Sequence, residues 1–232
     1  MKNYFILFLA IVVIGVSLIS CSAMSPDPVI VPDFEISDNI LGFQFENNSE
    51  DANSTNNLVA TGSPAYVTSD SKQGSYHVTF DESSFFETEN NYVHGTNAIT
   101  VSAWLYMDSA LSVNIMTFMK YDDFVIAWFK TEELLKAYIV GETAAETALT
   151  ANTWHHVITT YNGTTMKIYL NGSTTPVIEQ NQTGDFSTFD AKILVGSYSA
   201  AGLYYWLGKM DDIRIYDRVL STGEITALYD SY

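Results

Sequence analysis

Most of the chain alternates short apolar runs with clusters of Asn, Gly, Asp and Ser, a pattern that predicts β-strands joined by turns. The apolar runs are rich in Tyr, Phe, Thr, Val and Ile, the residues that favour strands. We expect strands within residues 39–45, 74–80, 98–107, 113–121, 123–130, 134–140, 192–198 and 204–216. Because nearly every segment is strand or turn, the pattern predicts an all-β fold, an antiparallel β-sandwich.

The clearest hairpin lies within residues 153–172, TWHHVITTYNGTTMKIYLNG. The Asn-Gly pair at 162–163 supplies the positive φ angles that a two-residue turn requires, and the pair at 171–172 turns the chain again. One short C-terminal helix is expected in LSTGEITALYDSY, because Ser221 and Glu224 have the spacing of a capping box.

The N-terminal end follows a different pattern, MKNYFILFLAIVVIGVSLISC. Lys2 precedes an apolar run that ends at Ile19, which is short for a membrane span of about 20 residues but fits a signal peptide. The last four residues of this segment resemble the lipobox of bacterial lipoproteins. The pattern therefore predicts a signal peptide over residues 1–20 and lipid attachment at Cys21.

The next segment, residues 21–37, contains three prolines and is interpreted as a tether. Residues 38–232 are expected to form one domain, since an all-β unit of this size commonly has a single core. We expect an exported, outward-facing protein of the bacterial cell envelope, which contacts the membrane only through its lipid anchor.

The charge of the chain limits its expected partners. Asp and Glu number 27 against 10 Lys and Arg, a formal net charge of −17. Nucleic acid and anionic lipid need a basic surface and are not expected as partners, whereas carboxylates support divalent cations. Cys21 is the single cysteine, so no intrachain disulfide forms.

Three segments, AITVSAWLYM, NTWHHVITTYNGTTMKIYLNG and WLGKMDDIRIYDRVLSTGEI, resemble in order and spacing the laminin G-like domains of the concanavalin A-like lectin and glucanase superfamily. The resemblance covers about residues 38–232. It implies a jelly roll of two antiparallel sheets packed face to face. It also implies binding of sugars or proteins, and a structural calcium ion.

The last of these segments contains two adjacent acids. If the strand alternates regularly, Asp211 shares a face with Ile213 and Ile215, while Asp212 shares the other face with Arg214. We therefore expect Asp211 to be buried and Asp212 to form a surface ion pair with Arg214. A buried carboxylate must be neutralised by hydrogen bonds, a base or a metal ion.

The resemblance implies a calcium ion where this strand meets the loop after the first strand, FENNSEDANSTNN. The expected ligands are Asp211, Glu46, Asn48 and Asp51, with backbone carbonyls of the loop at residues 46–57. The alternative is that Asp211 only accepts backbone hydrogen bonds.

Aromatic and acidic residues at expected turns are the candidate ligand contacts, because aromatic rings stack on sugars and carboxylates bind hydroxyl groups. The first group lies in MKYDDFVIAWF, and the second in GSYSAAGLYYW, which holds further tyrosines. The expected ligand-binding residues are Tyr121, Asp122, Trp128 and Tyr198.

The function expected from these observations is a non-catalytic, surface-anchored binding module for glycan or a cell-surface protein. No E-x-D-x-x-E motif of laminarinase-like hydrolases and no G-x-S-x-G occurs. Two alternatives stay open: a glycoside hydrolase or lyase of the same superfamily, and a structural subunit of a cell-surface complex.

Overall fold

The structure, a computed structural model, describes residues 40–110 and 112–232. The expected signal peptide, lipidated Cys21 and tether lie outside the described residues. Among the residues described, no helix has both the length and the apolar character needed to cross a membrane.

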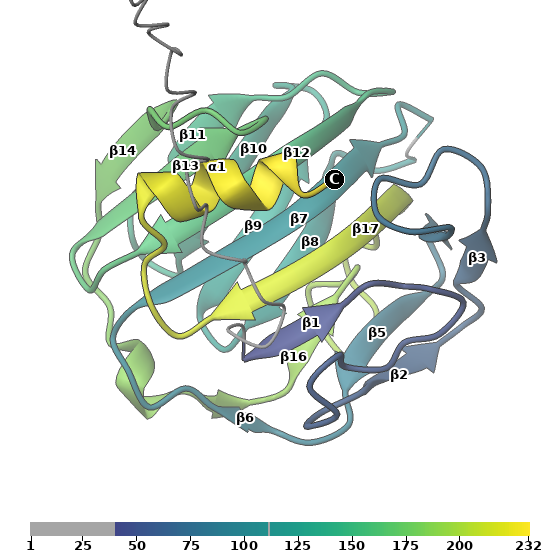
Figure 1. Ribbon diagram of the computed structural model, residues 1–232, viewed down its shortest axis with the longest axis horizontal. Helices are drawn as coiled ribbons and strands as arrows, with labels where there is room; N and C mark the ends of the chain where they lie inside the picture. The colour runs from purple at the N-terminus through teal and green to yellow at the C-terminus, as the bar shows by residue number, and fades with distance from the viewer. Residues whose placement is uncertain (1–39, 111) are drawn as a thin grey trace, which may run out of the picture. The chain divides into compact units, whose positions relative to one another are not determined.

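Two large antiparallel sheets make up the fold, and they confirm the predicted all-β class (Figure 1). In spatial order, sheet A contains β14 (Ile178–Asn181), β13 (Thr165–Leu170), β12 (Trp154–Tyr161), β7 (Ile99–Met107), β17 (Leu207–Tyr216), β4 (His77–Asp81) and β3 (Ala65–Val67), with β1 (Leu41–Phe43) also paired to β17. Sheet B contains β11 (Ala145–Ala148), β10 (Leu134–Ile139), β9 (Phe124–Phe129), β8 (Ile115–Tyr121), β16 (Ile193–Val195), β5 (Phe85–Thr88) and β2 (Leu58–Thr61). A two-stranded ribbon joins β6 (Tyr92–Val93) to β15 (Asp190–Ala191), and the 3₁₀ turn η2 covers Phe186–Thr188.

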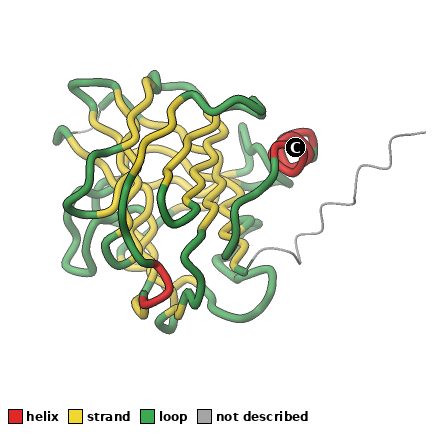
Figure 2. Tube along the Cα trace, turned by 90° about the vertical axis from the view of Figure 1, so that its left-hand side faces the viewer, coloured by secondary structure: helices red, strands yellow, loops and turns green. Residues whose placement is uncertain are grey.

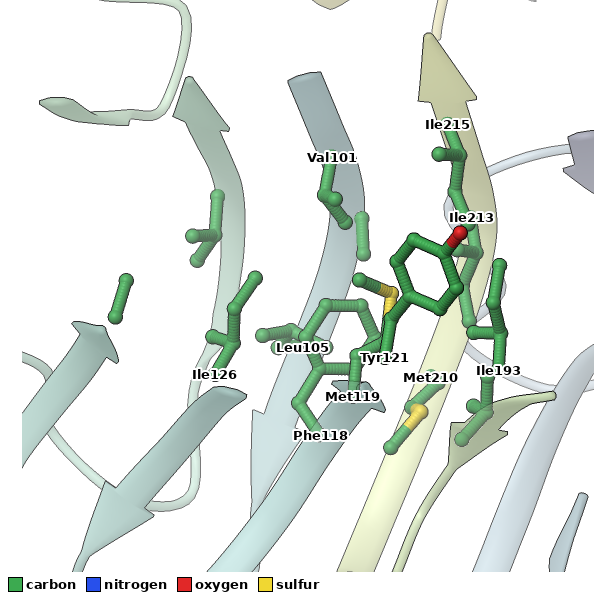
Figure 3. Close-up of a cluster of buried hydrophobic side chains, with 14 of the residues drawn as sticks. Val101, Leu105, Phe118, Met119, Tyr121, Ile126, Ile193, Met210, Ile213 and Ile215 are labelled. Carbon is green, nitrogen blue, oxygen red and sulfur yellow. The ribbon is translucent and has the colours of Figure 1, made fainter. Parts of the chain in front are cut away.

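The core is formed by the inward-facing side chains of both sheets. Sheet A contributes Leu105 and Ile213, and sheet B contributes Phe118, Ile126 and Ile193, all buried in one apolar cluster (Figure 3). Removal of this apolar surface from water is the main stabilising contribution to such a fold.

The hairpin and the helix predicted in the C-terminal half are present, but the first turn of the hairpin is longer than the two residues expected. Residues 162–164 connect β12 to β13, and of the Asn-Gly pair only Gly163 has a positive φ, 95°, which glycine adopts without the steric cost of a Cβ atom. Helix α1 (Thr222–Asp230) begins after Ser221, whose side chain accepts from the backbone N–H of Glu224 while the Glu224 side chain accepts from the backbone of Ser221. The predicted capping box is therefore present.

Helix α1 covers part of the outer face of sheet A, as the two perpendicular views show (Figures 1 and 2). Ile225 and Leu228 of the helix pack with Ile158, Tyr169 and Tyr216 of the sheet in a second apolar cluster. This part of sheet A is therefore buried on both faces.

Beside this cluster, the ring of His156 lies 5.1 Å from that of Trp104 and 5.2 Å from that of Tyr232. Its Nε2 is 2.9 Å from the hydroxyl of Ser102. Burial, with the nearby Arg214 guanidinium, lowers the pKa of His156 to about 3, so the imidazole is neutral at physiological pH. His156 is thus part of the packing between helix and sheet.

Candidate functional site

A β-bulge in β17 decides where the two adjacent acids point. Asp211 pairs with Trp104 of β7 and Arg214 pairs with Ser102, so two residues of β17 face the single residue between Trp104 and Ser102. Asp212, at a φ of 43°, is in the bulge. The regular alternation expected from the sequence is therefore interrupted between Asp211 and Arg214.

The bulge corrects the predicted faces of both acids. Ile213 and Ile215 belong to the core cluster, but Asp211 lies on the outer face of sheet A with its partner Trp104. Asp211 is nevertheless fully buried, as predicted, because the loop after β3 covers it. The prediction that Asp211 shares a face with Ile213 and Ile215 was wrong.

The Asp212–Arg214 pair exists, but it is buried and does not lie at the surface as expected. Arg214 Nε lies 2.8 Å from Asp212 Oδ2, with side-chain exposures of 3% and 0%. The hydroxyl of Tyr232 also donates to Asp212 Oδ2. Burial raises the pKa of Asp212, and the Arg214 guanidinium opposes that rise. The helix and the strands under it therefore enclose an ion pair, with a correspondingly large cost for breaking it.

Asp211 holds the loop after β3. Its Oδ2 accepts from the backbone N–H of Lys72 at 2.6 Å and of Gln73 at 2.9 Å. Its Oδ1 is buried and has no hydrogen-bond partner among the described residues. Burial raises the pKa of Asp211 to about 7, although hydrogen bonds from the backbone N–H groups of Gln73, Lys72 and Asp212 favour the ionised form. The alternative of backbone hydrogen bonding thus accounts for one carboxylate oxygen and leaves the other unsatisfied.

The carboxylate of Glu46 also binds the loop after β3. Its Oε1 accepts from the backbone N–H of Ser75 at 2.9 Å and of Tyr76 at 3.2 Å. Asp211 and Glu46 therefore anchor one loop, residues 70–76, although they are far apart in sequence.

The other two expected calcium ligands organise their own loop. The carboxylate of Asp51 accepts from the backbone N–H of Gly42 at 2.9 Å and of Thr55 at 2.9 Å. It also accepts hydrogen bonds from the Thr55 hydroxyl and from the backbone N–H of Asn56. Asn48 accepts from Glu50 and donates to Glu46 O. In the described part of the chain, no three Asp, Glu, His or Cys side chains converge as a metal-binding group. The expected set of Asp211, Glu46, Asn48 and Asp51 is therefore not assembled as one cluster.

Two of the expected sugar contacts are core residues. Tyr121 is 0% exposed and its hydroxyl donates to Tyr92 O at 2.9 Å. Trp128 is 1% exposed and its indole N–H donates to Leu149 O at 2.9 Å. Because both polar groups are satisfied inside the fold, the prediction that Tyr121 and Trp128 contact ligand was wrong.

Asp122 and Tyr198, by contrast, reach the surface and are linked by Lys120. The ammonium group of Lys120 donates to the backbone carbonyl of Asp122 and lies 5.2 Å from the ring centroid of Tyr198. Tyr138 of β10 aligns through Val125 of β9 with Lys120 of β8, so both lie on the outer face of sheet B. The hairpin tip and this outer face therefore form one continuous region.

Tyrosines gather at this region. The ring of Tyr204 lies 5.7 Å from that of Tyr198. Burial raises the pKa of Tyr138, and Tyr198 and Tyr204 add to the effect. We call this set, together with Leu203 and Tyr205, the tyrosine surface.

A surface pocket of about 310 Å³ adjoins the tyrosine surface. Its lining residues come from three loops: Glu82, Ser112, Val113, Gly202, Leu203, Tyr204 and Tyr205. Leu203 and Tyr204 are exposed at 53% and 44%. The carboxylate of Glu82 accepts from the backbone N–H of Ser112 at 2.6 Å, which holds two of the loops together. The pocket thus combines exposed apolar surface with one carboxylate.

The backbone presents Tyr204 at a conformational cost. Its φ of 51° is rare for an aromatic residue, and such strain is frequent at functional sites. The conformation is held because the Tyr204 carbonyl accepts from Thr117 at 2.8 Å, and Ser199 and Leu203 form an isolated bridge. The fold therefore fixes an exposed ring over the pocket.

The sequence predicted Tyr198 as a ligand-binding residue, but it carried no signal for Glu82, Val113 or Tyr138. Glu82 and Tyr138 are far apart in the chain, and only sheet and loop packing bring them to the same side. Tyr204 carried a local signal, since it stands in the tyrosine-containing turn segment that the sequence analysis singled out.

The chain belongs to the concanavalin A-like lectin/glucanases superfamily, because the family model of that description, Laminin_G_3, matches residues 80–226. The matched range contains the bulged strand and the tyrosine surface, and it excludes the loop at residues 46–57. A search of curated protein sequences gave no match.

Solved structures with the same fold include a domain of an arabinanase and the binding domain of a neurotoxin. Domain 4 of AbnA, a GH43 extracellular arabinanase from Geobacillus stearothermophilus in complex with arabinotriose, aligns with a TM-score of 0.65 at 18% identity, covering 82% of this chain and 97% of that one. The binding domain of botulinum neurotoxin DC in complex with SialylT aligns with a TM-score of 0.64 at 15% identity, covering 85% and 52%. The same toxin domain in complex with rat synaptotagmin II gives 0.64 at 14% identity, covering 84% and 52%. This chain thus spans about half of the toxin domains, and the likeness shows the jelly-roll-like fold.

Replacing Arg214 by methionine should destabilise the protein by about 3–5 kcal/mol, because the buried carboxylate of Asp212 loses its counter-charge. Urea unfolding measures the change. The matched control is Lys167→Met, which removes the exposed Lys167–Glu179 pair of the same sheet and should cost less than about 1 kcal/mol. Equal effects of the two variants would contradict a special role of the buried pair.

Proposed function

We propose that this chain is a glycan-binding module that contacts sugar through the tyrosine surface and the adjoining pocket. The observation that carries the proposal is Tyr204, an exposed ring held in a strained backbone conformation at the pocket. Aromatic rings offer flat apolar faces to the C–H face of a sugar at low entropic cost, and Glu82 adds a hydrogen-bond acceptor for hydroxyl groups.

A non-catalytic role is supported by the composition of the pocket. Glycoside hydrolases of the common type act with two carboxyl groups that flank the scissile bond. The residues that line the pocket include one carboxyl group, that of Glu82, and it is already engaged by Ser112. One fold neighbour is a domain of an arabinanase in complex with arabinotriose, and another is the binding domain of a neurotoxin in complex with SialylT, which agrees with a binding module.

Substitution of Tyr204 separates binding from folding. Tyr204→Gly should keep the protein folded, because glycine adopts the positive φ without strain, yet weaken glycan binding about tenfold. Tyr198→Ala should act in the same direction. Affinity electrophoresis against a panel of polysaccharides, including arabinan, measures binding, and thermal unfolding checks the fold.

The control for this experiment is Tyr76→Ala, a half-buried tyrosine that precedes β4 in sheet A, which should leave binding unchanged. Absence of binding to every glycan would reject a glycan as the ligand. Release of reducing ends would show that the protein is a glycoside hydrolase and not only a binding module. Equal binding by Tyr204→Gly and the unsubstituted protein would place the glycan elsewhere.

We also propose that a structural calcium ion binds at Asp211. The support is its buried Oδ1, which lacks a partner among the described residues, and a second acid, Glu46, which accepts hydrogen bonds from the same loop that Asp211 holds. Backbone carbonyls would supply the remaining oxygens, while Asn48 and Asp51 stay committed to their own loop. The bound ion would neutralise a carboxylate that is otherwise costly to ionise.

The calcium proposal predicts a pH-dependent effect on the melting temperature. Without a cation, ionising Asp211 costs stability as the pH rises from about 4, its unfolded pKa, through about 7, because the folded state must release a proton that it favours. At about pH 8, Ca²⁺ should raise the melting temperature, since metal ligands bind in the deprotonated form. The increase should vanish near pH 5 and in Asp211→Asn. An unchanged melting temperature with Ca²⁺ or EDTA, together with a silent Asp211→Asn, would reject the site.

The N-terminal segment supports a further proposal, that Cys21 carries lipid and tethers the module to the outside of a bacterial membrane. In cells that produce the protein, labelled palmitate should be incorporated and the protein should sediment with membranes. Cys21→Ala should lose both properties, whereas Ser22→Ala should keep them. Label retained by Cys21→Ala would reject the assignment.

A further inference from the structure

A row of large side chains crosses the outer face of sheet A, on the opposite sheet from the tyrosine surface. Trp154 of β12 pairs with Tyr106 of β7, and Tyr106 pairs with Lys209 of β17. The rings of Trp154 and Tyr106 lie 5.8 Å apart, and the ammonium group of Lys209 lies 4.6 Å from the Tyr106 ring. All three side chains are half-buried. Helix α1 leaves this part of the face partly open.

Two hydrogen-bond donors and one further ammonium group surround the carboxylate of Asp70 at this row. The indole N–H of Trp154 donates to Asp70 Oδ2 at 2.7 Å, and Lys209 Nζ lies 3.0 Å from the same oxygen. Lys72 Nζ lies 3.7 Å from Oδ1. Burial alone would raise the pKa of Asp70, but the hydrogen bonds from Lys209 and Trp154 outweigh it and hold the pKa below its ordinary value. The arrangement therefore binds a carboxylate in its ionised form.

The charge balance of this group is unusual for the chain. Two ammonium groups share the single carboxylate of Asp70, whereas the whole chain has a net charge of −17. At physiological ionic strength, exposed charges act over about 8 Å, so a ligand at this row senses Lys72 and Lys209 more than distant acids. This group is therefore a locally positive region on an acidic protein, and an anion can bind there.

A buried histidine beside the row points independently to a missing partner. His77 is 1% exposed, and its ring meets that of Trp154 edge-on at 5.7 Å. Within the part of the chain that the structure describes, neither ring nitrogen has a hydrogen-bond partner. Buried polar atoms are nearly always satisfied, so these two nitrogens next to Trp154 lack the polar neighbour that such atoms usually have.

The Asp70 side chain can move away from Trp154, Lys209 and Lys72. Its side chain is 48% exposed, and its backbone has a φ of 65°, which few residues other than Gly, Asn and Asp adopt. The loop itself stays anchored through Lys72 and Gln73 to Asp211 and through Ser75 and Tyr76 to Glu46. Rotation of the Asp70 side chain therefore frees the donors without moving the loop.

We propose that Trp154, Lys209 and Lys72 form a carboxylate-binding site for an acidic sugar unit of a uronic acid-containing polysaccharide, and that Asp70 occupies this site when the ligand is absent. The sugar carboxylate takes the place of the Asp70 carboxylate and forms the same charge-assisted contacts. The sugar ring packs against Trp154 and Tyr106. The proposal adds a second site to the proposed glycan-binding function, on the opposite sheet, and it is tested by different variants.

An acidic sugar fits this site better than a peptide carboxylate does. The donors stand beside two half-buried aromatic rings, which provide apolar contact for the C–H groups of a pyranose. Charge-assisted hydrogen bonds then distinguish the acid from its neutral ester, because the ester offers no ionised oxygen to the two lysines.

Isothermal titration calorimetry of the full chain with an oligogalacturonide and with its methyl ester tests the site. The acid should bind at least about tenfold more tightly than the ester. Asp70→Asn should strengthen binding of the acid by a further factor of about ten, because the competing charge is removed while asparagine retains the positive φ. A variant that gains affinity cannot owe its effect to misfolding.

Loss of donors should have the opposite effect. Trp154→Phe retains a ring but lacks the N–H donor, and Lys209→Gln lacks the charge, so both should weaken binding of the acid more than that of the ester and narrow the difference between the two ligands. Tyr204→Gly, on the other sheet, should leave the preference for the acid intact. Thermal unfolding confirms that each variant is folded.

Four results would overturn the proposal, and the last of them would move the acidic sugar to the other sheet. The first is equal affinity for the acid and its ester, and the second is an Asp70→Asn variant that binds no more tightly than the unsubstituted protein. The third is competition by oligoglutamate as strong as that by the oligogalacturonide, which would assign the site to peptide carboxylates. Loss of the acid preference in Tyr204→Gly would instead place the acidic sugar at the tyrosine surface.

Discussion

The bulge at Asp211 and Asp212 is the constraint on which the arrangement of sheet A depends. One extra residue in β17 leaves Ile213 and Ile215 in the core, yet turns both acids to the outer face. Asp211 there anchors the loop after β3, and Asp212 binds Arg214 and Tyr232 beneath helix α1. The loop at residues 70–76 and helix α1 both cover sheet A. They are therefore attached to it through two neighbouring residues of β17. Their attachment is electrostatic and lies in a region of low dielectric, where unpaired charge is costly.

Features with local causes could be predicted from the sequence. The hairpin around Asn162-Gly163 and the capping box of Ser221 and Glu224 depend on residues a few positions apart, and both are present. The face of Asp211 could not be predicted in this way, because the bulge is defined by the spacing of Trp104 and Ser102 on a distant strand. Strict alternation is valid only while the two strands advance in step. The burial of Asp211 was nevertheless expected correctly, since both faces of β17 are covered.

The candidate site was less predictable, for a related reason. An aromatic residue in a strand has the same appearance in the sequence whether it faces the core or the solvent. Tyr121 and Trp128 face the core, whereas Tyr138 faces outward on a strand that was predicted without a role. Membership of the superfamily did not resolve the matter, because the motifs that carry it are hairpin and strand residues that maintain the fold. Surface chemistry in such a sandwich depends on loops such as the one that contains Tyr204, and loop conformation is set by contacts from other parts of the chain.

The double anchoring of the loop at residues 70–76 has a kinetic consequence. Four backbone N–H groups of this loop are held by two carboxylates, so its main chain has little freedom to open. Asp70 stands outside these anchors and moves by rotation of its own side chain, a motion of picoseconds to nanoseconds, whereas loops rearrange in nanoseconds to microseconds. Exchange of one carboxylate for another at Trp154 and Lys209 would then be limited by the rate of encounter. Binding and release of a carboxylate ligand would therefore be fast and reversible, with no slow conformational step.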